Sequence, residues 1–123
     1  MKTFGEFYRE KVLSRKDLEE RALPSSSEEV LVEKDLFGWK LRVDGKTAPC
    51  RSEVEARFIG IFLEAGMTEL MVPKDDDYLR EILPELEKMK VRLEQVFEHY
   101  AQGIRNPRTR EILKQKVYVQ LLQ

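Results

Sequence analysis

The feature that most constrains the fold is a run of apolar residues in the second half of the chain. Seven of them recur with strict three-four alternation, the spacing of one helix face over three heptads: Leu79, Ile82, Leu86, Met89, Leu93, Val96 and Tyr100. Three aspartates at 75–77 precede this seam and Gly103 follows it, which predicts one long helix. Pro84 lies on its outer side and predicts either a kink or a helix that properly begins there after one preceding turn.

A last helix is predicted after the long one. Asn106 and Pro107 are residue types favoured at the N-cap and at the first helical position. The seam can pack on this helix, on the rest of the domain or on a second chain, but its apolar surface exceeds what one helix covers. We therefore expect a homodimer through the hairpin 74–123, with these interface residues: Leu79, Ile82, Leu86, Met89, Leu93, Val96, Tyr100, Val117 and Leu121.

The N-terminal segment has a helical pattern. Thr3 and Glu6 form a capping-box pattern, and the apolar residues that follow predict a helix to about Leu13. A second cap pattern begins at Ser14. It predicts a further turn or a continuation of the helix through Leu18, Ala22 and Leu23 until Pro24 stops it.

The middle of the chain changes to a period of two. Residues 30–33 and 39–43 alternate as strands do, and Asp44-Gly45 predicts a two-residue type I′ turn into a return strand over 46–50. Pro49 lacks a backbone donor, so the return strand is short or lies at an edge. Residues 68–72 indicate a fourth short strand, closed by Pro73.

A helix is predicted between the third and the fourth strand. Ser52 and Glu55 form another capping box, and apolar residues recur at helical spacing until Gly66. We expect this helix to be the most buried element, with a neighbour close to the backbone at Gly60. The chain is thus predicted to be one α+β domain over 1–123, with a helix-plus-sheet core in 1–73 and the helical hairpin in 74–123.

Charge bounds the partners of the chain. There are 22 basic and 23 acidic residues, so a nucleic-acid role would need local patches. Two patches are candidates: Lys40, Arg42 and Lys46 on the sheet, and Arg105, Arg108 and Arg110 at the start of the last helix. Cations are unfavourable at a helix N-terminus, so we expect Glu94 and Glu98 of the preceding helix to compensate the arginines; a phosphate backbone is the alternative.

No catalytic, cofactor or metal site is predicted. A single cysteine, Cys50, and a single histidine, His99, exclude an intrachain disulfide and multi-ligand zinc sets. The aspartates at 75–77 indicate a helix start, and Asp35, Asp44 and Lys46 match a nuclease metal site poorly because the acid lies in the turn. A helix N-terminus can lower the pKa of the Cys50 thiol, but a small, partly buried residue is the favoured interpretation.

These observations lead to one functional expectation and one alternative. No apolar stretch approaches the roughly 18 residues of a membrane span, and the first residues lack the apolar core of a signal peptide. We expect a cytoplasmic, non-enzymatic protein-protein interaction or adaptor module that homodimerises through its C-terminal helices. The alternative is a small nucleic-acid-binding protein that uses the two basic patches.

Overall fold

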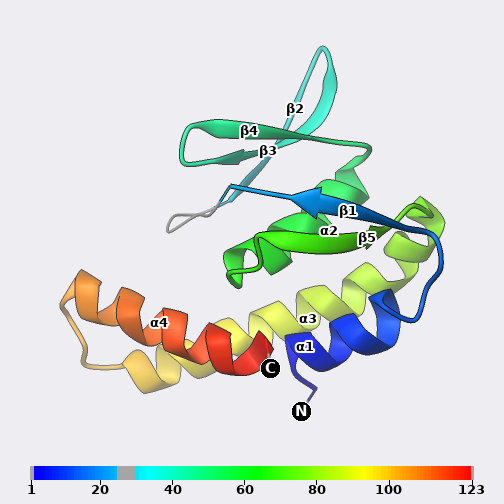
Figure 1. Cartoon of the computed structure of the whole chain (residues 1–123). Coiled ribbons are helices and arrows are strands. Elements are labelled where there is room, and N and C mark those ends of the chain that lie inside the picture. The colour runs from blue at the N-terminus through cyan, green and yellow to red at the C-terminus, as the bar shows by residue number, and fades with distance from the viewer. Residues whose placement is uncertain (1, 25–29, 123) are drawn as a thin grey trace.

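The structure, a computed structural model, describes residues 2–24 and 30–122, with only the backbone described for 115 and 117–122. The elements follow in the order α1 (Phe4–Phe7), a π-helical turn η1 (Tyr8–Val12), β1 (Leu18–Ala22), β2 (Leu31–Asp35), β3 (Gly38–Val43), β4 (Lys46–Cys50), α2 (Glu53–Glu64), β5 (Glu69–Pro73), α3 (Asp76–Ala101) and α4 (Pro107–Leu122) (Figure 1). The predicted α+β class is confirmed.

The first helical segment begins and ends where the sequence predicts. The Thr3 hydroxyl accepts a hydrogen bond from the Glu6 amide at 3.1 Å, and helical backbone continues to Val12. The predicted second cap at Ser14 is wrong. Its hydroxyl donates instead to the carbonyl of Glu10 at 2.7 Å, so Ser14 closes the helix rather than starting another turn.

Strand β1 replaces the predicted helical continuation. It pairs antiparallel with β5, with Leu18 opposite Pro73 and Ala22 opposite Glu69. The expected helix through Leu18, Ala22 and Leu23 is therefore wrong. The sequence Leu-Glu-Glu-Arg-Ala favours a helix locally, but helix propensity is weak and pairing with a distant strand overrides it. The predicted fourth strand is present as β5, and its partner is β1 rather than the central sheet.

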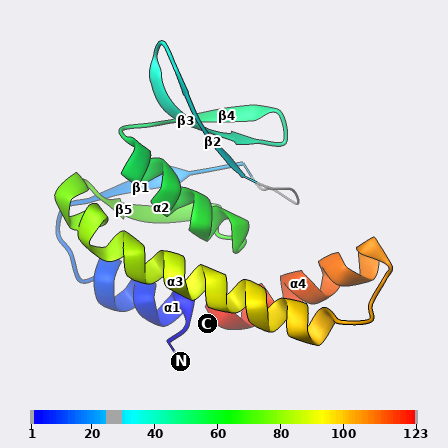
Figure 2. The same ribbon diagram turned by 180° about the vertical axis from the view of Figure 1, so that it is seen from behind.

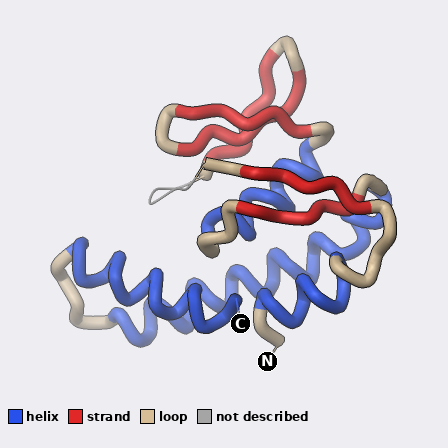
Figure 3. The backbone as a smooth tube through the Cα atoms, viewed as in Figure 1, coloured by secondary structure: helices blue, strands red, loops and turns tan. Residues whose placement is uncertain are grey.

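Strands β2, β3 and β4 form the predicted three-stranded antiparallel sheet, with β3 in the middle (Figure 3). Asp44 and Gly45 both have positive φ, 49° and 79°, as a type I′ turn requires. Strand β4 is an edge, as Pro49 predicts. Leu41 and Ala48 are paired and buried, and they lie on the face that packs against α2.

Helix α2 is the most buried helix, as expected. It lies between the three-stranded sheet, the β1–β5 pair and α3 (Figures 1 and 2). Every residue from Val54 to Leu63 is buried except Arg57. The ring of Phe62 is fully buried and meets the rings of Phe58 and Tyr8 edge-on, at centroid distances of 5.2 and 5.6 Å.

The C-terminal half forms the predicted helical hairpin. Helix α3 continues through Pro84, and the Asp75 carboxylate caps its start by accepting from the amides of Asp77 and Tyr78 at 3.0 and 3.2 Å. After Gly103 the chain turns back, and α4 lies beside α3 with its far end next to α1 (Figures 1 and 2).

The glycine within α2 yields a stability prediction. A Cβ at Gly60 would lie 3.5 Å from Leu41 Cδ2 and 3.7 Å from Val30 Cγ1, so side chains rather than backbone approach it and a methyl group fits. We expect Gly60→Ala to raise the free energy of unfolding by ~0.5–1 kcal/mol, because alanine favours helix and restricts the unfolded chain. Urea denaturation measures the change.

Gly66 is the matched control for that substitution. Its φ of +101° is strained for any residue with a Cβ, although the space around it is open. Gly66→Ala should therefore lower the free energy of unfolding by ~1–2 kcal/mol. A lower free energy of unfolding for Gly60→Ala would contradict the conclusion that a methyl group fits between α2 and β3 at this position.

Candidate functional site

Most of the apolar seam of α3 lies in the core of its own chain. Leu79, Ile82, Leu86 and Leu93 are each at most 5 % exposed, and Met89 is half-buried against the same core. Of the remaining predicted interface residues, Val117 and Leu121 lie outside the described side chains. The structure therefore leaves two members of the seam at the surface: Val96 and Tyr100, which are 37 % and 69 % exposed.

These two residues lie on the outer face of α3 near its end. Together with Arg92, Gln95 and His99 they line a shallow hollow of about 500 Å³. The His99 and Tyr100 rings contact each other edge-on at a centroid distance of 5.6 Å. Contact with a second chain at this place would bury Val96 and Tyr100, and it stays a prediction.

The arginines around the start of α4 are not equivalent. Arg110 binds both carboxylate oxygens of Glu98 at 2.8 and 2.9 Å and donates to the carbonyls of Ala101 and Ile104 at 3.2 and 3.3 Å. It thus caps the end of α3 and clamps the hairpin, and the expected compensation by Glu98 is confirmed for this arginine.

Two members of that arginine cluster remain at the surface. Arg105 and Arg108 are exposed and form no ion pair with the described side chains. Glu94, the other expected partner of the cluster, lies near Lys90 instead, at 3.9 Å. The cluster predicted from the sequence is therefore reduced to two exposed cations.

The cations of the sheet do not form one basic face. Lys40 pairs with Asp35 at 2.7 Å and Arg42 with Glu33 at 3.1 Å, both across the β2–β3 pair. Lys46 lies opposite the buried Val43, so it belongs to the other face of the sheet. Carboxylates therefore neutralise Lys40 and Arg42, and Lys46 lies on the opposite face of the sheet from both.

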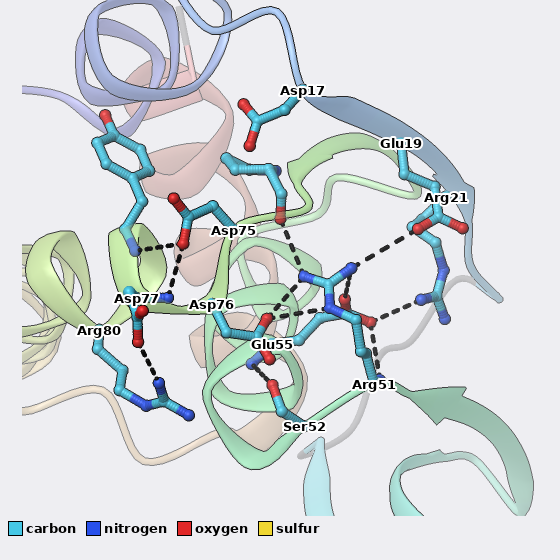
Figure 4. A network of polar contacts seen from close by, with 12 residues as sticks. Asp17, Glu19, Arg21, Arg51, Ser52, Glu55, Asp75, Asp76, Asp77 and Arg80 are labelled. Carbon is cyan, nitrogen blue, oxygen red and sulfur yellow. Dashed lines mark hydrogen bonds and ion pairs between the residues drawn. The ribbon is translucent and has the colours of Figure 1, made fainter.

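An ion-pair network around the buried Glu55 carboxylate joins three elements of the core. Glu55 is 1 % exposed, and its carboxylate pairs with Arg21 and Arg51, each at 2.8 Å (Figure 4). Arg51 also donates to Asp76 at 2.8 Å and to the carbonyl of Pro73 at 3.0 Å. The network connects β1, the start of α2 and the junction of β5 with α3. Its carboxylates are all paired with arginine side chains.

The aspartates at 75–77 serve the helix start, as predicted. Asp75 caps α3, Asp76 binds Arg51, and Asp77 pairs with Arg80 at 2.8 Å (Figure 4). Partial burial works to raise the pKa of Asp76, but hydrogen bonds from Arg51 and Ser52 outweigh it, and the pKa is lowered. Among the described residues, no group of three or more His, Cys, Asp or Glu side chains could hold a metal ion.

Cys50 is partly buried and is not activated. Burial, followed by the nearby Glu55 carboxylate, raises the pKa of its thiol to about 11. The alternative of a pKa lowered by the helix N-terminus is therefore wrong. The favoured interpretation, a small partly buried residue, agrees with the structure.

The most exposed apolar residues of the described chain were not predicted from the sequence. Leu36 and Phe37 form the two-residue turn between β2 and β3 and are 99 % and 98 % exposed. This turn projects away from the body of the molecule (Figures 1 and 3). Asp35 before the pair and Gly38 after it are residue types favoured at the first and fourth positions of a type I turn. That local pattern is the signal that could have located the turn.

Polar contacts fix the conformation of this hairpin tip, defined as Leu36 and Phe37. The Asp35 carboxylate accepts from the Phe37 amide at 2.8 Å and from the Lys40 ammonium at 2.7 Å. The Lys40 contact and then the Phe37 amide lower the pKa of Asp35. Further down the hairpin, Leu41 is fully buried against α2. The tip therefore presents two apolar side chains on an ordered support.

A groove lies beside the root of the same hairpin. It has a volume of about 270 Å³, and its apolar lining comes from three sides: Val30 and Val32, Gly60 and Ile61 of α2, and Val91 of α3. We call it the side groove. Its rim carries the ion pair of Arg57 with Glu87 and that of Lys90 with Glu64, at 2.5 and 2.8 Å.

Comparisons of the chain with protein-family models, curated proteins and solved structures found no match. None of the helices in the described part of the chain is long and apolar enough to cross a membrane.

The network around Glu55 makes a stability prediction. Glu55→Ala removes a partner of two partly exposed arginines that keep other contacts, so the free energy of unfolding should fall by ~1–3 kcal/mol in urea denaturation. Glu53→Ala is the control, because Glu53 is exposed in the same helical turn and its loss should change stability by no more than ~0.5 kcal/mol. Equal effects of the two substitutions would contradict the structural role of the network.

The thiol of Cys50 makes a reactivity prediction. A pKa raised from 9.0 to about 11 reduces the thiolate fraction at pH 8 by about 100-fold. A thiolate of higher pKa is also more nucleophilic, so labelling of the folded protein with iodoacetamide at pH 8 should be slower than labelling of the urea-unfolded protein by roughly 10-fold or more. Equal rates in the two states would show that the thiol is neither buried nor perturbed.

Proposed function

We propose that the chain is a non-enzymatic, cytoplasmic interaction module that binds another protein through its hairpin tip. The near-complete exposure of Leu36 and Phe37 supports this proposal most directly. Burying a side chain of this size contributes roughly 1.5–3 kcal/mol to the free energy of unfolding. Because Leu36 and Phe37 are exposed, neither makes this contribution in the isolated chain. A binding partner that covers the tip recovers it.

The construction of the tip favours binding. An ordered turn loses little conformational entropy when it docks, because the Asp35 contacts already hold its backbone. Aromatic side chains in partner pockets are typical centres of binding energy, and Phe37 has the required exposure. The flanking charges are mixed, with Lys34 and Lys40 beside Asp35, whereas docking on an anionic membrane favours clustered cations.

The homodimer contact predicted through the C-terminal helices is a separate candidate with less support than the hairpin tip. Within the described side chains it would use Val96 and Tyr100 of α3, because the earlier members of the seam pack inside their own chain. The nucleic-acid alternative has less support. Lys40, Arg42 and Arg110 are each paired with a carboxylate, which leaves fewer cations for phosphate contacts.

Site-specific photo-crosslinking tests the proposal. With p-benzoylphenylalanine in place of Phe37, irradiation of cells that make the protein should yield a discrete protein adduct, because the probe keeps the aromatic anchor. The control carries the probe at Leu13, which is 46 % exposed at the end of the first helical segment. A second substitution, Leu36→Asp, should abolish the adduct by placing a charge in the contact. Absence of any adduct at position 37 would contradict binding through the tip.

A further inference from the structure

We propose that the partner of the hairpin tip is a second copy of this chain, whose side groove receives Leu36 and Phe37. The inference rests on the proposed function, because it requires the tip to be a binding element. It adds the identity of the partner and the surface that the tip meets, and both surfaces belong to the same molecule.

The side groove fits the tip in size and polarity. A volume of about 270 Å³ lies just below the roughly 300–1,000 Å³ of pockets that hold drug-sized ligands, so the groove suits a few side chains rather than a whole helix. Val32 and Val91 remain 37 % and 51 % exposed on its walls, and Gly60 adds no side chain to its floor. Docking of two apolar side chains would cover both valines.

The charges around the two surfaces are complementary. The rim of the groove has three carboxylates and two cations, a net charge of −1: Glu64, Glu87 and Glu94, with Arg57 and Lys90. The tip is flanked by Lys34 and Lys40 with Asp35, a net charge of +1. Opposite charges therefore meet when the tip of one copy enters the groove of another, which favours this contact over contact between two tips.

A single strand carries both surfaces. Val32 of β2 lines the groove, and Leu36 follows the end of the same strand, so an advance of about 3.4 Å per residue separates them by roughly 14 Å. Two copies with antiparallel hairpins would each place a tip beside the groove of the other, which closes the dimer with two identical contacts. The opposite edge of the sheet is less suited to another chain, because Pro49 in β4 lacks a backbone donor.

Analytical ultracentrifugation of the full chain and its variants is the first test. The wild type should dimerise, and Phe37→Asp and Val91→Arg should each raise the dissociation constant by roughly 30-fold or more, as loss of a hot spot does. Ile112→Arg is the matched control, because Ile112 is 48 % exposed and belongs to α4, which contributes no residue to the tip or to the lining of the groove. Tyr100→Asp should also leave the dimer intact, whereas a contact through the outer face of α3 requires Tyr100. Circular dichroism verifies that each variant is folded.

Mixing the two disrupted variants gives the sharper test. Phe37→Asp retains an intact groove and Val91→Arg retains an intact tip, so a mixture can form one tip-in-groove contact. The mixture should associate more tightly than either variant alone. No gain on mixing would overturn the inference, as would a wild type that stays monomeric or a dimer that both substitutions leave intact.

The crosslinking experiment separates the two proposals. An adduct at position 37 with the mass of two chains supports tip-in-groove docking. An adduct with a different protein overturns docking between copies and leaves the interaction module standing. If the probe yields no protein adduct, or only lipid adducts, both proposals fail.

Discussion

The burial of helix α2 is the interaction on which the rest of the structure depends. The three-stranded sheet, the β1–β5 pair and α3 each pack against it, so its side chains form the common core of the molecule (Figures 1 and 2). Phe58 and Phe62 are fully buried at the centre, and Glu55 at the start of the helix binds arginines from two directions. Because Leu41 of β3 is buried against the same helix, α2 also fixes the root of the projecting hairpin.

Features encoded within a few neighbouring residues could be predicted from the sequence. The cap at Ser52, the type I′ turn at Asp44 and Gly45, and the start of α3 at Asp75 each follow from local backbone chemistry. Strand β1 was not predictable in this way. Its residues are good helix formers, and only pairing with β5, some fifty residues away, makes them a strand.

The candidate site shows the same division between local and distant information. Periodicity identified the apolar face of α3, but it cannot tell which partner covers that face, and most of it, including Leu86 and Leu93, packs within the chain. The tip was missed for a different reason. A type I turn accepts most residues at its central positions, so Leu36 and Phe37 carry no sequence signal of their own. Their exposure follows only from the direction in which β2 and β3 leave the core.

Isolated exposed apolar residues are common on proteins and need no functional explanation, and Leu13 and Ile112, each about half exposed, fit that description. The hairpin tip is different in kind. Its two residues are adjacent, almost wholly exposed and lifted away from the body on a turn that polar side chains would form equally well. Leucine and phenylalanine at these positions do not stabilise the fold, but their burial would stabilise a contact with another surface. The side groove of the same chain has the size and charge to be that surface.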